Sequence, residues 1–171
     1  MNLRATILKE HSRNTRDKII KWVGNSQQRF DELFELFITD EDLVMQRAAW
    51  PVSYIIIAQP QLIQKHFDRL IKNLGKSKLH AAVKRNTVRL LQDIDIPQRF
   101  HGDIMNICFN YVASPEEPAA VKAFSLTILQ NLSDQYPEIR NELKLIIDER
   151  WNYETAAFRS RARKILKEFS S

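Results

Sequence analysis

Apolar and small residues recur along this chain with the spacing of a repeated amphipathic helix. In the segment from Val83 to Ile94, apolar residues stand at offsets 0, 8 and 11, and a small residue stands at offset 4. These offsets share one stripe of a helix with 3.6 residues per turn, so the segment would bury one face. The same pattern begins at three other positions, and successive copies start 39, 38 and 37 residues apart: Val44, Val121 and Phe158.

A second series of apolar stripes alternates with these helices and keeps their period. Its four members begin 37, 37 and 39 residues apart: Phe30, Phe67, Ile104 and Leu143. Prolines precede the last three stripes, and a proline can begin a helix without the loss of a hydrogen bond. Thr39 and Ser114 are each followed by acidic residues and are expected to cap the next helices. Short connections would make each consecutive pair of helices an antiparallel hairpin.

The fixed period of about 38 residues predicts an all-α fold, an α-α superhelix built from helical pairs. We expect a single helix over residues 3–23, inside an N-terminal cap (1–24), and then four hairpin repeats at about 26–58, 60–95, 97–133 and 135–170. That makes about nine helices and no strand. No stretch resembles an interdomain linker, so we expect residues 1–171 to form one domain. Pro51 lies inside a predicted helix and should bend it, or leave a carbonyl free for a ligand.

We call the Phe30 series the first helices and the Val83 series the second helices. Val83-Lys84-Arg85 and Val121-Lys122-Ala123, each followed by a small residue and paired aliphatics, resemble the second helix of HEAT repeats. The two acidic residues and the proline that lead into the third of these helices, Glu116-Glu117-Pro118, also resemble HEAT repeats. The resemblance covers about residues 26–170. It implies a HEAT or armadillo-like solenoid whose second helices line a concave, partner-binding surface.

The basic residue that follows the valine of each second helix recurs in three copies and is Met45 in the first copy: Lys84, Lys122 and Arg159. The whole chain also resembles small bacterial HEAT-like proteins, some of which carry the label adenylosuccinate lyase. A lyase of that kind is a much longer chain with a Ser-Ser-x-Met-Pro loop, and this sequence has no such loop. The resemblance therefore does not imply lyase activity.

The sequence offers no motif for catalysis, a cofactor or a metal. The four histidines have no second ligand at metal-binding spacing, and glycines at positions 24, 75 and 102 cannot form a phosphate-binding loop. No serine stands in a nucleophile elbow. Cys108 lies in an apolar stripe and is expected to be a buried core thiol. We therefore expect a protein that is not an enzyme and binds no cofactor.

The chain also lacks signals for a membrane or for export. Its longest apolar run is far too short to cross a bilayer, and its first 20 residues have no apolar core of the kind a signal peptide needs. A single cysteine suits a reducing compartment. We expect a cytoplasmic protein that does not contact membranes.

Positive charge is concentrated on the second helices. The net charge is +5. The second helices carry ten basic and four acidic residues; they span 42–57, 80–94, 117–132 and 155–169. The first helices carry eight basic and nine acidic residues; they span 26–38, 60–75, 97–112 and 136–150. On each second helix, offsets 2, 6 and 9 oppose the apolar stripe; in the first copy these are Gln46, Trp50 and Ser53. The candidate partner-binding residues are Trp50, Arg85, Arg89, Lys164 and Lys167. Trp50 could instead lean sideways onto a neighbouring helix.

These features favour a non-catalytic scaffold whose basic concave face binds a protein or peptide with acidic groups. The alternative is nucleic-acid binding by the same face. This would resemble the DNA-alkylation-repeat glycosylases, which use HEAT-like stacks. The catalytic positions of those proteins have no match here. The stacked aromatics typical of single-strand binding are also missing from the pattern.

Overall fold

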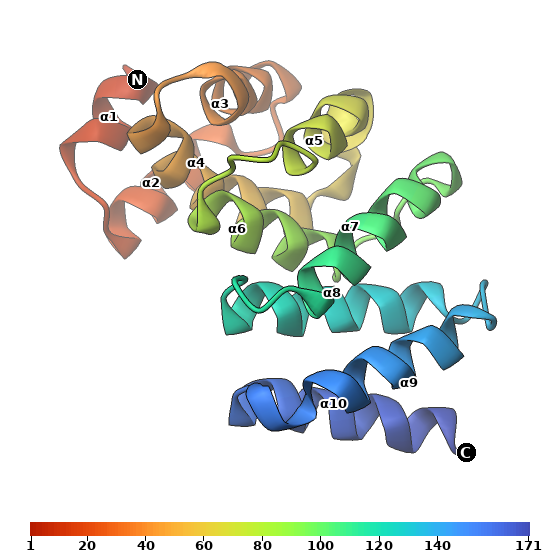
Figure 1. Ribbon diagram of the computed structural model, residues 1–171. Coiled ribbons are helices and arrows are strands. Elements are labelled where there is room, and N and C mark those ends of the chain that lie inside the picture. Colours follow the sequence, from red (N-terminus) through yellow and green to blue (C-terminus); the bar gives the residue numbers. More distant parts are fainter. The chain divides into compact units, whose positions relative to one another are not determined.

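The computed structural model describes every residue from Met1 to Ser171 and consists of ten α-helices, three 3₁₀ segments and no strand (Figure 1). The all-α prediction is confirmed. The chain forms two compact units, Met1–Asp95 and Ile96–Ser171. The expectation of one domain stays a prediction.

The first unit is organised around α4, a helix of 17 residues. Its elements are α1 (Leu3–Lys9), α2 (Arg13–Val23), α3 (Gln27–Thr39), α4 (Asp42–Ala58), η1 (Pro60–His66), α5 (Phe67–Leu74) and α6 (Ala81–Leu91). Helices α1, α2, α3 and α6 all pack on α4, while α3 also contacts α5. The two predicted hairpins, α3–α4 and η1/α5–α6, therefore stack second helix on second helix and first helix on first helix.

The N-terminal region contains two helices where one was predicted. Helix α1 ends at Lys9, and α2 begins at Arg13 because Ser12 adopts an extended backbone and its hydroxyl accepts from the Thr15 amide. Both helices pack on α4. Gly24 ends α2 as predicted, with φ of 53°, and its amide donates to the Ile20 carbonyl. The prediction of one cap helix was wrong because a local N-cap interrupts the apolar pattern.

The first helix of the second repeat begins as a 3₁₀ segment. Pro60 stands at its first turn, and α-helical geometry starts only at Phe67. The Leu62 carbonyl accepts a hydrogen bond of 2.9 Å from Gln27 Nε2 of α3. This bond from the neighbouring repeat satisfies a carbonyl that an α-helix would use internally. Gly75 ends α5, as predicted.

The second unit repeats the arrangement. Its elements are η2 (Gln98–Phe100), α7 (His101–Ala113), α8 (Ala119–Leu132), α9 (Ile139–Arg150), η3 (Trp151–Tyr153) and α10 (Ala156–Phe169). Within this unit α7 packs on α8, α8 on α10, and α7 on α9. Here too, second helices contact second helices and first helices contact first helices.

The predicted core stripe is confirmed along α4 and α8, where all four positions are buried: Val44, Ala48, Val52, Ile55, Val121, Ser125, Leu129 and Leu132. In the copy that begins at Val83, the residue at offset 11 is only half-buried, and in the copy that begins at Phe158, so are those at offsets 8 and 11. These residues are Ile94, Leu166 and Phe169. Offset 7 is buried in every copy: Pro51, Leu90, Ile128 and Ile165. The second helices are therefore buried over more than one stripe, because each packs on its hairpin partner and on a neighbouring second helix.

Two predicted caps do not form. Thr39 is the last residue of α3 and donates back to the Glu35 carbonyl, while Glu41 precedes α4 without a side-chain cap. Ser114 accepts from the Glu116 amide within a loop, and α8 begins only at Ala119. Short hydroxyls readily form such local bonds in turns as well as at helix starts.

Cys108 lies fully buried in α7, as predicted, and burial raises the pKa of its thiol to about 12. Because the thiolate is the reactive form, this residue is an inert part of the core at neutral pH.

Candidate partner-binding surface

A cluster of two arginines and two aromatic residues joins three helices of the first unit. Trp50 and Tyr54 stand one turn apart on α4, and so lie on the same side of that helix. Arg16 comes from α2 and Arg89 from α6. We call these four residues the Arg–aromatic cluster.

Tyr54 is the centre of the cluster. The Cζ atoms of Arg16 and Arg89 lie 4.4 and 4.2 Å from the centroid of its ring. Both distances fall within the range of cation–π attraction. The pKa of the Tyr54 phenol is lowered, mainly by the guanidinium of Arg89, with burial acting in the opposite direction. The phenol ring therefore helps to hold the guanidinium of Arg89 in place.

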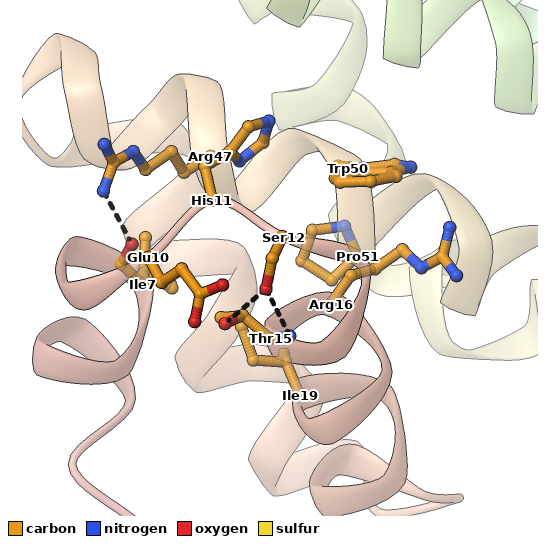
Figure 2. A pocket seen from close by; sticks show the side chains of 10 residues that line it. All are labelled: Ile7, Glu10, His11, Ser12, Thr15, Arg16, Ile19, Arg47, Trp50 and Pro51. Atoms are coloured by element: carbon orange, nitrogen blue, oxygen red, sulfur yellow. Dashed lines mark hydrogen bonds between the residues drawn. The ribbon is translucent and has the colours of Figure 1, made fainter.

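Trp50 also leans on the N-terminal helices. Its ring lies 5.2 Å from the ring of His11, and Arg16 Cζ lies 4.8 Å from its centroid. Figure 2 shows Trp50, Pro51 and Arg16 lying together at the edge of a surface pocket. Trp50 is half-buried, so the sideways arrangement that the sequence left open is the one found.

The pocket beside Trp50 lies where α1, α2 and α4 meet. Arg47 reaches from α4 and donates to the Ile7 carbonyl at the end of α1, at 3.2 Å (Figure 2). It also donates to the Leu8 carbonyl, at 2.7 Å. Its charge therefore serves α1 and is not free for a partner. The pocket has room for about 10 Å³, which is about one water molecule, so it is too small to hold a small-molecule ligand.

The helical register predicted an exposed position for Ser53, and this prediction was wrong. It is fully buried, and its hydroxyl lies 2.8 Å from the Trp50 carbonyl and 3.3 Å from Asn86 Oδ1. Asn86 in turn donates to the Ala82 carbonyl within α6. The contact between α4 and α6 covers this position, and a single-helix register does not include such a contact.

Helix α6 carries the two predicted arginines and no carboxylate. Its sequence, Ala81–Leu91, contains three basic and no acidic residues. Arg85 is exposed and forms no ion pair or hydrogen bond through its side chain. Arg89, one turn further on, is half-buried against Tyr54, with its Nη1 3.5 Å from Ser53 Oγ. The structure thus brings Trp50 and Arg89 into one cluster and places Arg85 beside it on α6.

The other two predicted residues, Lys164 and Lys167, belong to α10 in the second unit. Both are exposed and free of ion pairs. Two neighbouring cations on this helix are engaged within the unit: Arg161 donates to Thr127, and Arg163 Cζ lies 5.2 Å from the ring of Trp151. That all five predicted residues serve one partner stays a prediction.

One cation counted on the second helices is not at the surface. Lys122 is 2% exposed, and its ammonium lies 2.5 Å from Glu154 Oε1. Arg150 donates to the same carboxylate oxygen at 2.8 Å. Lys122 therefore links α8 to the segment before α10.

The net charge of the chain belongs to the first unit. Residues 1–95 carry sixteen lysines and arginines against eleven aspartates and glutamates, whereas residues 96–171 carry ten of each. The first unit therefore has a net charge of +5, and the second has none. An acidic partner would be attracted to the unit that contains the Arg–aromatic cluster.

Sequence reasoning missed Arg16 and Tyr54. The spacing of Tyr54 from Trp50, four residues on one helix, could have indicated a shared face. Arg16 gave no such signal, because it reaches the cluster from α2. No group of three or more metal-ligating side chains gathers anywhere in the molecule, and no helix is both long and apolar enough to cross a membrane.

Within each unit, antiparallel helical hairpins stack with second helix on second helix, which defines an all-α repeat protein. The chain belongs to the HEAT repeat family, since the family model described as a HEAT repeat domain matches residues 3–169. The match confirms the resemblance and extends it over both N-terminal helices. No curated protein and no solved structure matches this chain.

Proposed function

We propose that this HEAT repeat protein is a non-catalytic scaffold that binds a protein or peptide carrying acidic groups. The binding surface is the exposed side of α6 together with the adjoining part of α4. The observation that carries the proposal is the pair Arg85 and Arg89, one turn apart on a helix without a carboxylate. Like charges four residues apart weaken a helix by about 0.2–0.5 kcal/mol, so the pair does not stabilise α6 itself.

The environment of the two arginines supports this role. Arg89 is held against Tyr54, so it loses less side-chain freedom when it binds an anion. Trp50, in the same cluster, is half-buried beneath Arg16, and Trp, Tyr and Arg are the residues that dominate interface hot spots. The excess positive charge of the first unit would speed association with an acidic partner.

Nucleic-acid binding is the second candidate, supported by the same positive charge. The aromatic rings argue against single strands, because guanidinium groups already cover Tyr54 and Trp50. Bases stack on free aromatic faces. A duplex, bound through its phosphates alone, would still suit the charge.

Binding of two labelled probes separates these candidates: a glutamate-rich peptide and a short DNA duplex. We expect the peptide to bind, and Arg85→Glu with Arg89→Glu to weaken binding by about tenfold or more. The matched control is Lys72→Glu with Lys76→Glu. It makes the same charge change at exposed, unpaired lysines of the first unit and should change binding far less.

Equal weakening by both pairs would mean that binding follows bulk charge, and the proposed surface would be wrong. Tight duplex binding with a steep salt dependence, and none to the peptide, would favour nucleic acid. Arg140 and Lys144 are less suitable controls. Both lie near the ring of Phe169, and Arg140 also pairs with Asp134, so their reversal would disturb the second unit.

A further inference from the structure

Arg85 and Arg89 are placed to converge on a single anionic group. Residues four apart on a helix have Cβ atoms about 5–6 Å apart, and an arginine side chain is long enough to span that gap. Arg85 is exposed and free to move toward its neighbour. No carboxylate of the chain neutralises either side chain. Asp93, four residues after Arg89, forms no ion pair with it.

Arg89 presents its donors in a fixed orientation. Its guanidinium lies over the Tyr54 ring, with Cζ 4.2 Å from the ring centroid, and Ser53 Oγ lies 3.5 Å from Nη1. Tyr54 is itself held from α2 by Arg16, whose own charge is matched by Asp17 at 2.7 Å. Arg16 is therefore a support for the ring, and Arg89 is the member of the cluster with an unmatched charge. Planar donors of this kind suit phosphate and carboxylate oxygens.

We propose that Arg85 and Arg89 bind a phosphomonoester carried by a side chain of the partner protein, such as phosphoserine. This rests on the proposed function and names the acidic group that the surface recognises. A phosphomonoester carries a charge of about −1.5 to −2 at pH 7 and three acceptor oxygens, so one group can satisfy both arginines. A carboxylate or a phosphodiester carries one charge and would leave one arginine unmatched.

Three peptides test the proposal: the glutamate-rich probe with glutamate, serine or phosphoserine at its central position. We expect the phosphoserine peptide to bind about tenfold more tightly than the glutamate peptide. Its affinity should rise between pH 5 and pH 7, because the second phosphate proton leaves near pH 6. The glutamate peptide should show only a small rise, since most of its carboxylates are already ionised at pH 5.

Arg85→Lys with Arg89→Lys keeps the charge and removes the planar donors. We expect this variant to bind the phosphoserine and glutamate peptides about equally, while its melting temperature shows that the fold is kept. Lys72→Arg with Lys76→Arg is the control and should keep the preference.

Equal binding of the phosphoserine and glutamate peptides would overturn this inference and leave the proposed function in place. Failure of every peptide to bind would overturn the proposed function itself. A preference for phosphoserine that survives in the lysine variant would place the phosphate site elsewhere. Binding of the duplex alone, lost in the same variant, would assign the arginine pair to nucleic acid.

Discussion

Lys122 and Glu154 form a buried ion pair between consecutive repeats. The two side chains are 2% and 5% exposed, and Nζ lies 2.5 Å from Oε1. Lys122 is the fourth residue of α8, and Glu154 is the second residue before α10. Arg150 shares the same carboxylate, so a single anion balances two cations in the interior of the second unit.

The first two repeats have apolar residues at the two positions of this pair. Met45 is the fourth residue of α4, and Leu79 is the second residue before α6. They therefore hold the positions that Lys122 and Glu154 hold one pair of repeats later. The sequence therefore allows a charged or an apolar residue at both positions.

We predict that Glu154→Leu alone destabilises the protein by about 3–5 kcal/mol, because Lys122 and Arg150 would lose their buried partner. The double variant Lys122→Met with Glu154→Leu should recover the part of that loss that comes from Lys122, as well-packed apolar residues often replace buried ion pairs. Urea unfolding followed by circular dichroism measures both. If the double variant is no more stable than Glu154→Leu, the correspondence with Met45 and Leu79 has no energetic meaning.

Ser125→Phe tests the close approach of helices at the small core position. Ser125 is fully buried in α8, and its hydroxyl donates to the Val121 carbonyl at 2.8 Å. A benzyl group has no space there, so we predict a loss of roughly 1–3 kcal/mol or more from overpacking. A thermal melt of this variant beside Ser125→Ala separates the effect of volume from that of the hydroxyl. An unchanged melting temperature for Ser125→Phe would be incompatible with the buried position.

Asp31 links stability to acid pH. Burial tends to raise the pKa of this carboxyl, but hydrogen bonds from Lys65, His66 and Gln27 outweigh it and lower the pKa to about 2. The lowered value stabilises the fold at pH values above the unfolded pKa of 3.8, and this stability is lost as the pH falls from about 3.8 to about 2. The carboxyl is 28% exposed, so we expect roughly 1–2 kcal/mol.

Asp31→Asn is therefore predicted to lower stability at pH 7 and to flatten the acid limb of the stability curve. Stability measured from pH 7 down to pH 2 for both proteins tests this. Curves that stay parallel below pH 4 would show that Asp31 makes no such contribution.

Asn73 is a buried amide without partners. Its side chain is 2% exposed, and neither Nδ2 nor Oδ1 forms a hydrogen bond. An unsatisfied buried polar group costs about 1–3 kcal/mol, so replacement by an apolar residue of similar size should stabilise the protein. We predict that Asn73→Leu raises the free energy of unfolding by about 1 kcal/mol or more. A drop in denaturation midpoint would instead reveal that the amide has a partner in solution.

The sequence by itself determined the number and order of the repeats. Each second helix begins near its predicted residue, and α4 and α8 bury the predicted stripe, because that stripe depends only on spacings of three and four residues. The same local spacing placed Arg85 on an exposed side of α6. The break between α1 and α2 is also local, but a serine cap overrode the apolar pattern there.

The tertiary structure alone decided which cations are free. Lys122 and Lys164 both stand on basic second helices, yet Lys122 is buried against Glu154 and Lys164 is exposed. Arg16 reaches Tyr54 from another helix in the same way. These partners lie more than 30 residues apart in the chain, so no local pattern predicts them. Periodicity specifies which face of a helix is apolar, whereas the pairing of a charge depends on which other segment the fold brings against it.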